Sequence, residues 1–316
     1  MTQTQISLPP EIENLVQGLY KNVTQIIYGK KNTVEKVIMA LLTGGHVLLE
    51  DVPGVGKTLL AKTISDSLDA KFSRIQCTPD LLPSDISGVS IYNPEKREFK
   101  FLKGPVFTNI LLVDEINRAA PRTQSCLLEA MEENQLTIEG KTYKLDKPFF
   151  VIATQNPIEY HGTFELPEAQ LDRFIVVLSL GYPSENEENE ILEYYLKTDE
   201  YSVDPVLSVE SYIELYNYIR NITVSREIRK YIIDIVNETR NNANVRLGVS
   251  PRGSLALLKM SQASALLAGR NYVIPDDVKN IAVDVFSHRV IPIHRRGLLA
   301  NNSIIKDIVE KIKVPE

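Results

Sequence analysis

The sequence contains no run of about 18 or more apolar residues, so it offers no candidate for a membrane-spanning helix. Its first residues, Met1 to Gln5, show neither the basic nor the apolar region of a signal peptide. Only two cysteines are present, Cys77 and Cys126, which are too few for a disulfide framework. We therefore expect a cytoplasmic protein, from a reducing compartment, in which both thiols are small buried side chains.

Histidine is also scarce, and positive charge is not in excess. The four histidines, His46, His161, His288 and His294, show no metal-ligand spacing, and we interpret them as structural. The formal net charge of −6 makes nucleic acid an unexpected partner, although a local basic patch is compatible with it. What is present is the composition of a globular protein, 43% hydrophobic and 24% charged, in a chain of 316 residues that is long enough for two domains.

The chain is organised around residues 47–58, where a short apolar run precedes a glycine-containing turn and then a helical pattern. Strand, loop and helix in this order are the context of a phosphate-binding loop. Gly54 and Gly56 allow successive N–H groups to face one anion, and the helix N-terminus adds partial positive charge. Lys57 would neutralise the β- and γ-phosphates of a nucleotide, and the Thr58 hydroxyl would bind Mg²⁺. The predicted nucleotide-binding residues are Pro53, Gly54, Val55, Gly56, Lys57, Thr58 and Leu59.

One position departs from this motif. Asp51 stands where the pattern G-x-x-x-x-G-K-[ST] has its first glycine. A carboxylate there suggests backbone strain and repulsion of phosphate, so the affinity for nucleotide is open at this stage. The alternative for the whole stretch is a glycine-rich turn that binds nothing.

Carboxylates follow a second apolar run. Residues 109–113 indicate a buried parallel strand, and Asp114 and Glu115 come directly after it, at the sheet edge where open α/β folds bind ligands. Asp114 would hold Mg²⁺, and Glu115 would activate the attacking water as general base. A further predicted strand, residues 149–155, ends near Asn156, which is placed to bind the γ-phosphate or the water. The alternative is that Asn156 and Pro157 only turn the chain.

Two arginines attract attention for their positions. Arg173 stands at the end of a short predicted helix before the last strand, where it pairs with a surface carboxylate or reaches a neighbouring subunit's nucleotide. Arg252 lies in the first turn of a helix that Ser250 caps, a position where a cation opposes the helix dipole and so needs another reason. Residues 183–210 are acidic and polar, and the helical stripes beyond them predict a small bundle.

Two predicted hairpins, at 89–101 and 135–146, interrupt the α/β pattern, and such insertions often carry function. Packing of their aromatic residues on neighbouring helices is the equal alternative. The turn at 28–30, after a predicted helix over 11–28, is a common place for backbone to hold a purine ring, or it is a plain connector.

Together these motifs resemble a MoxR-type AAA+ ATPase, of the clade that also contains the motor subunits of magnesium chelatase. The resemblance runs from about residue 20 to 297. The blocks that carry it are Gly54–Thr58, Gly104–Phe107, Leu112–Ala119, Ala153–Pro157, Leu166–Phe174 and Ser250–Gly253.

The resemblance implies an α/β fold: a P-loop core with a five-stranded parallel sheet of order 5-1-4-3-2 and a four-helix C-terminal lid. It also implies a hexameric ring with Mg-ATP between subunits, in which Asn156 is sensor 1, Arg173 an arginine finger acting in trans and Arg252 sensor 2. The hairpins would be the helix-2 and pre-sensor-1 insertions that line the pore. We divide the chain into a core (1–183, with N-terminal helices at 11–45), a linker (184–210) and the lid (211–316).

The implied activity is ATP hydrolysis that drives chaperone-like remodelling or maturation of a client protein complex, with a von Willebrand factor A-domain protein as a partner. Other functions fit the same motifs: the motor subunit of a metal-chelatase complex, a nucleic-acid motor, or a nucleotide-binding protein that has lost hydrolysis. The acidic charge and the lack of a DNA-binding module disfavour the second of these, and Glu115, Asn156 and Arg173 disfavour the third.

Overall fold

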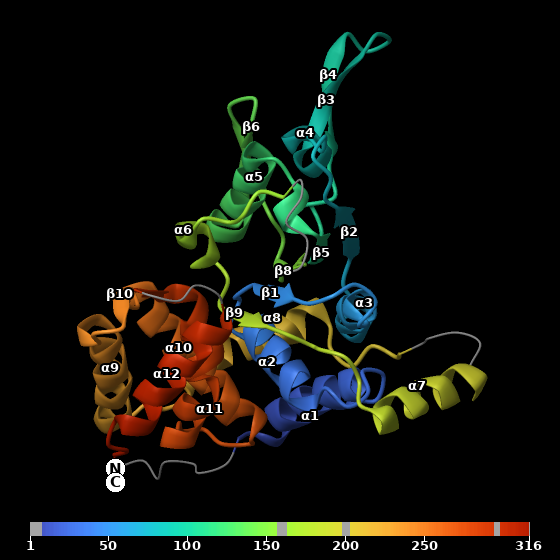
Figure 1. Ribbon diagram of the computed structural model, residues 1–316. Helices are drawn as coiled ribbons and strands as arrows, with labels where there is room; N and C mark the ends of the chain where they lie inside the picture. Colours follow the sequence, from blue (N-terminus) through green and yellow to red (C-terminus); the bar gives the residue numbers. More distant parts are fainter. Residues whose placement is uncertain (1–7, 157–162, 198–202, 294–297, 316) are drawn as a thin grey trace.

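The computed structural model describes residues 8–156, 163–197, 203–293 and 298–315 (Figure 1). Its centre is a sheet of five parallel strands in the order β2-β5-β8-β1-β9. These strands are β1 (Val47–Glu50), β2 (Phe72–Gln76), β5 (Ile110–Asp114), β8 (Phe150–Gln155) and β9 (Val176–Leu178). Numbered one to five along the chain, they have the order 5-1-4-3-2, so the predicted topology is confirmed. Within the described ranges, no helix is both long enough and apolar enough to cross a membrane.

The middle strands are continuous apolar runs because both faces of the sheet are covered. Alternate residues of β5 belong to different core clusters: Leu112 faces one layer, and Leu111 and Val113 face the other. The first layer holds α1 (Pro10–Thr24), α2 (Lys31–Leu42) and α3 (Lys57–Ser67). The second layer holds α4 (Pro83–Ser87) and α5 (Pro121–Glu133). This layering brings the carboxyl ends of β1, β5 and β8 to one edge.

Both predicted hairpins are present, as β3 (Gly88–Asn93) with β4 (Glu98–Lys103) and β6 (Gln135–Ile138) with β7 (Lys141–Lys144). The β3–β4 hairpin stands out from the body (Figure 1). The Phe101 ring stacks on Tyr143 with a centroid distance of 4.6 Å, and Ser90 Oγ donates to Glu139 Oε2 at 2.7 Å. These contacts join the two hairpins at their sides.

The stretch predicted as a linker, 184–210, is in part helical, because α7 spans Glu185–Lys197. Glutamates fill its first turn, where negative charge stabilises a helix N-terminus. The α-helices described after α7 are α8 (Val209–Tyr218), α9 (Arg226–Asn241), α10 (Pro251–Leu267), α11 (Pro275–Phe286) and α12 (Leu298–Lys311). A short ribbon of β10 (Val245–Leu247) and β11 (Ile291–Pro292) accompanies them.

The described chain beyond residue 203 thus has five α-helices, not the four implied for the lid. The extra one, α8, packs on the core: Tyr212 Oη donates to the Leu41 carbonyl at 2.9 Å. One hydrophobic cluster continues from the sheet and α2 through Leu257 of α10 to Ile305 of α12. The lid therefore shares its apolar core with the α/β half of the chain.

The cysteines and histidines occupy structural positions where the structure describes them. Cys77 is buried and Cys126 is half-buried, and both are free thiols. His46 and His288 are buried, whereas His161 and His294 lie outside the described residues. His46 is held as the neutral ring, because Val151 N donates to its Nδ1 at 3.1 Å and its Nε2 lies 3.0 Å from the Met131 carbonyl.

Burial lowers the pKa of His46 to about 4. Its pKa in the folded state lies below the ordinary value, so protonation favours the unfolded chain. We expect the free energy of unfolding to fall as the pH drops from about 6.5 to 4, by roughly 1.4 kcal/mol per unit of pKa difference. Urea unfolding at pH 7 and pH 4.5 measures this. His46→Gln, which does not titrate, should lose less stability between these values; an equal loss in both proteins contradicts the assignment.

Candidate active site

The loop between β1 and α3 has the geometry that its glycines predict. Gly54 and Gly56 have φ values of 86° and 90°, the left-handed region that glycine enters without strain. Lys57 begins α3, and its Nζ donates to the carbonyls of Asp51 and Val52, each at 3.1 Å. Burial lowers the pKa of Lys57, and nearby carboxylates oppose that effect. The ammonium group is therefore held over the loop, where it can meet an anion.

Asp51 does not show the strain that its place in the motif suggests. It is absent from the described residues with positive φ, and its side chain is buried. Its carboxylate accepts hydrogen bonds from the backbone N–H groups of Leu180 and Gly181, at 2.6 and 2.9 Å, and from Ser179 Oγ at 2.8 Å. Asp51 thus ties the start of the loop to the chain after β9.

At the end of β5, Asp114 and Glu115 are both held by neighbours. The Asp114 carboxylate pairs with Arg74 Nε at 2.7 Å and accepts from Thr154 Oγ1 at 3.3 Å. Glu115 has a φ of 55°, an uncommon value for a residue with a side chain, of the kind found at functional sites.

The Glu115 backbone N–H donates to Thr154 Oγ1 at 2.9 Å, so β8 helps to fix this conformation. Its carboxylate accepts from Gln76 Nε2 at 2.8 Å and from Arg118 at 3.0 Å. Neither Gln76 nor Arg74 stood out in the sequence, although both lie on β2 two residues apart and so on the same face of the strand.

These groups line one cleft of about 370 Å³. Its lining residues are Asp51, Pro53, Gly54, Gly56, Lys57, Thr58, Leu59, Arg74, Gln76, Asp114, Glu115, Thr154 and Asn156. The cleft is lined by hydrogen-bond donors, the loop N–H groups and the Lys57 ammonium group, and by hydroxyl and carboxylate oxygens. Oxygen ligands suit Mg²⁺, and the guanidinium that already faces Asp114 shows that this carboxylate attracts a cation. Thr58 and Asp114 therefore fit a magnesium site.

A second, mainly apolar cleft of about 220 Å³ shares Gly54, Gly56 and Leu59 with the first. It is lined by Ile26, Ile27, Tyr28, Lys30, Gly54, Val55, Gly56, Leu59, Gly181, Pro183, Ile191 and Tyr194. The two tyrosines belong to the 28–30 turn and to α7, and their ring centroids are 5.9 Å apart. A flat aromatic base fits such a cleft while its phosphates reach the loop.

Comparison with known proteins agrees with this geometry. Residues 46–176 match the ATPase family associated with various cellular activities (AAA), and residues 237–311 match the AAA lid domain. The chain is 42% identical over 293 residues to Chaperone MoxR1 of Mycobacterium tuberculosis, covering 90% of this chain and 77% of that protein. The chain belongs to the MoxR family of AAA+ ATPases.

Other relatives of this MoxR-type ATPase match most of its length. It is 47% identical over 308 residues to the uncharacterised protein YeaC of Bacillus subtilis, with 96% of each chain covered. It is 29% identical over 291 residues to the protein MoxR of Paracoccus denitrificans, with 84% of this chain and 85% of that protein covered. A solved structure of a proposed ATPase from Cytophaga hutchinsonii superposes with a TM-score of 0.89, at 38% identity and 96% coverage of both chains.

Two predicted residues of this MoxR-type ATPase line neither cleft. Arg173 follows α6 (Glu168–Leu171) and pairs through Nε with Glu132 Oε2 at 3.0 Å. Arg252, in the first turn of α10, pairs with the other oxygen of the same carboxylate. Glu132 thus supplies the partner that a cation at this helix N-terminus needs. The structure places both arginines on one carboxylate, and neither lines either of the two clefts at the loop.

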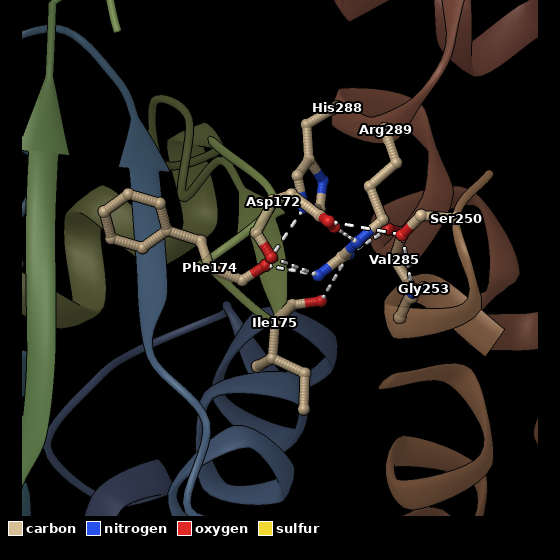
Figure 2. A network of polar contacts seen from close by, with 8 residues as sticks. All are labelled: Asp172, Phe174, Ile175, Ser250, Gly253, Val285, His288 and Arg289. Atoms are coloured by element: carbon tan, nitrogen blue, oxygen red, sulfur yellow. Dashed lines mark hydrogen bonds and ion pairs between the residues drawn. The ribbon is translucent and has the colours of Figure 1, made fainter. Parts of the chain in front are cut away.

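A buried arginine that the sequence did not single out joins the lid to this region (Figure 2). Arg289 Nε pairs with Asp172 Oδ1 at 2.6 Å, and its other nitrogens donate to the carbonyls of Asp172, Phe174, Ile175 and Val285. Burial lowers the pKa of Arg289 to about 10, so it stays charged at neutral pH.

Ser250 and Gly253, the first and last residues of the motif at the start of α10, both lie next to the Arg289–Asp172 ion pair. Ser250 Oγ donates to Asp172 Oδ2 at 3.2 Å and also caps α10 by accepting from the Gly253 N–H. A Cβ on Gly253 would lie 2.4 Å from the Val249 side chain and 3.0 Å from Arg289. The glycine therefore leaves room within the lid for Val249 and for the Arg289 side chain that bonds to Asp172 and Phe174.

Proposed function

We propose that this MoxR-type protein binds and hydrolyses Mg-ATP at the subunit interfaces of a ring, and that hydrolysis drives remodelling or maturation of partner protein complexes. The family and the cleft support ATP as the substrate. The name of the M. tuberculosis relative, Chaperone MoxR1, supports protein complexes as the clients. A hexamer is the ring that the resemblance implies.

In this proposal the residues of the cleft divide the chemistry among them. The loop N–H groups and Lys57 bind the phosphates, while Thr58 and Asp114 hold Mg²⁺, which would neutralise charge on the β- and γ-phosphates. Glu115 accepts the proton of the attacking water, and Asn156 orients that water or the γ-phosphate. The second cleft holds the base.

The observation that carries the ring is the position of Arg173 and Arg252. A phosphoryl-transfer site gains from a cation that neutralises the transition state. Neither arginine lines either of the two clefts at the loop, and both pair with Glu132. Two adjacent guanidinium groups with one carboxylate leave net positive charge, which a neighbouring subunit's triphosphate can complement.

The hairpins are the proposed contact with clients. Tyr92 and Phe99 form a cross-strand pair and are 49% and 72% exposed, although aromatic rings of this size are usually covered. A von Willebrand factor A-domain protein is the partner that the family resemblance suggests for presenting such a client.

Calorimetric titration with ATP in the presence of Mg²⁺ tests the proposal. Lys57→Ala should lose detectable binding, because the loop then lacks the charge that meets the β- and γ-phosphates. Lys62→Ala is the matched control, since Lys62 is exposed on the same helix and lines neither cleft. Absence of heat with the wild-type protein at millimolar ATP would reject ATP as its substrate.

A further inference from the structure

Arg74 occupies an unexpected place in the cleft. It lies on β2, the edge strand, in register with Leu112, while Gln76 is opposite Asp114. From there its Nε reaches the Asp114 carboxylate at 2.7 Å. Asp114 is nearly enclosed, with 10% of its side chain exposed, whereas half of the Arg74 side chain is in solvent. A half-exposed cation therefore covers a nearly buried anion.

This ion pair conflicts with the proposed role of Asp114. One carboxylate oxygen accepts from Arg74, and the other accepts from Thr154 Oγ1. A magnesium ion that approaches Asp114, directly or through a bound water, needs one of these oxygens. A guanidinium cannot act as a metal ligand, and two cations on one carboxylate repel each other.

We propose that Arg74 is the counter-ion of Asp114 in the metal-free protein and that Mg²⁺ displaces it when Mg-ATP binds. This inference rests on the proposed function, because it assumes a nucleotide site at Asp114. Little else holds the side chain, because its other hydrogen bond, from Nη2 to Gln76 Oε1, is long at 3.4 Å. Once displaced, the Arg74 side chain no longer bridges β2 and β5, while the backbone pairing of the two strands remains.

If Mg²⁺ displaces Arg74, removing Arg74 should change how much Mg²⁺ strengthens nucleotide binding. This effect can be measured without ATP turnover. Mg²⁺ must break the Arg74–Asp114 contact in the wild-type protein but not in Arg74→Gln. Breaking a partly exposed ion pair with a charge-assisted hydrogen bond lowers the affinity for the competing ligand by about three- to tenfold. The gain that Mg²⁺ gives to nucleotide binding should therefore be about three- to tenfold larger in Arg74→Gln.

The experiment measures the dissociation constant of a fluorescent ATP analogue, mant-ATP, with excess Mg²⁺ and with EDTA. The ratio of the two constants reports the gain from Mg²⁺ and cancels changes in nucleotide affinity that do not depend on the metal. Arg118→Gln is the matched control, because Arg118 pairs with Glu115 and not with Asp114, and its ratio should equal that of the wild type. Arg74→Lys keeps the cation and should stay near the wild-type ratio.

The outcomes separate this inference from the function on which it rests. If wild-type protein binds no mant-ATP in either condition, the proposed nucleotide site fails. If it binds, and Arg74→Gln has an unchanged ratio, Arg74 does not compete with Mg²⁺. A smaller ratio in Arg74→Gln would also overturn the inference, since Arg74 would then support the metal-bound state through the phosphates.

Discussion

Arg173→Ala is expected to lower ATP turnover by about 10³–10⁵-fold, the range that an arginine finger contributes. This corresponds to roughly 4–7 kcal/mol of transition-state stabilisation. ATP binding should not change, because Arg173 lines neither cleft of its own chain. Steady-state turnover and calorimetric ATP titration of the same preparation measure the two effects. Wild-type turnover per subunit should also rise with protein concentration as rings form.

Mixing variants shows whether the arginine acts on a neighbour. Lys57→Ala keeps Arg173 but has a defective loop, and Arg173→Ala keeps the loop. A mixed ring contains interfaces where one variant supplies the loop and the other the arginine, so some activity should return. A monomeric enzyme cannot produce this rescue. Turnover that is independent of concentration, together with no rescue, would place Arg173 in a cis role or in a surface ion pair with Glu132.

Glu115→Gln should hold ATP without turning it over. The change removes the base but keeps the shape of the side chain, and its oxygen can still accept from Gln76. Loss of a general base typically costs about two to four orders of magnitude in rate. Single-turnover hydrolysis of bound ATP measures the step directly, and ATP titration checks that binding persists. Equal rates for variant and wild type would assign the base to another group.

The sequence was most informative where structure is local or buried on both sides. The β5 and β8 runs are apolar throughout because helices cover both faces of the sheet. Such a run can be recognised as a buried strand without knowing which elements pack against it. The glycines of the loop and the carboxylates after β5 could be placed together because parallel strands end at a common edge. The structure confirms that placement, while the catalytic role of each residue stays a prediction.

The contacts that hold the site could not be predicted from the same patterns. Arg74 and Gln76 act across β2 and β5, so finding them requires the register between two strands that lie far apart in sequence. Glu132 lies in the last turn of α5, and its importance depends on two arginines from other elements. The acidic stretch before the lid looked like a linker because its charges are frequent in linkers, yet its glutamates also suit the first turn of α7.

The ion pair and hydrogen bonds of Arg289 fix the lid to the segment that carries Arg173. This side chain donates to carbonyls of Asp172 and Phe174, on both sides of Arg173, and it comes from the lid. Removing one partner of such a buried ion pair typically lowers the free energy of unfolding by about 3–5 kcal/mol, so the contact between Arg289 and Asp172 does not break easily. Arg173 and Arg252 are therefore coupled, because Arg289 fixes the lid to both sides of Arg173 and Glu132 pairs with both arginines. We expect a displacement of the lid that moves Arg252 to move Arg173 as well.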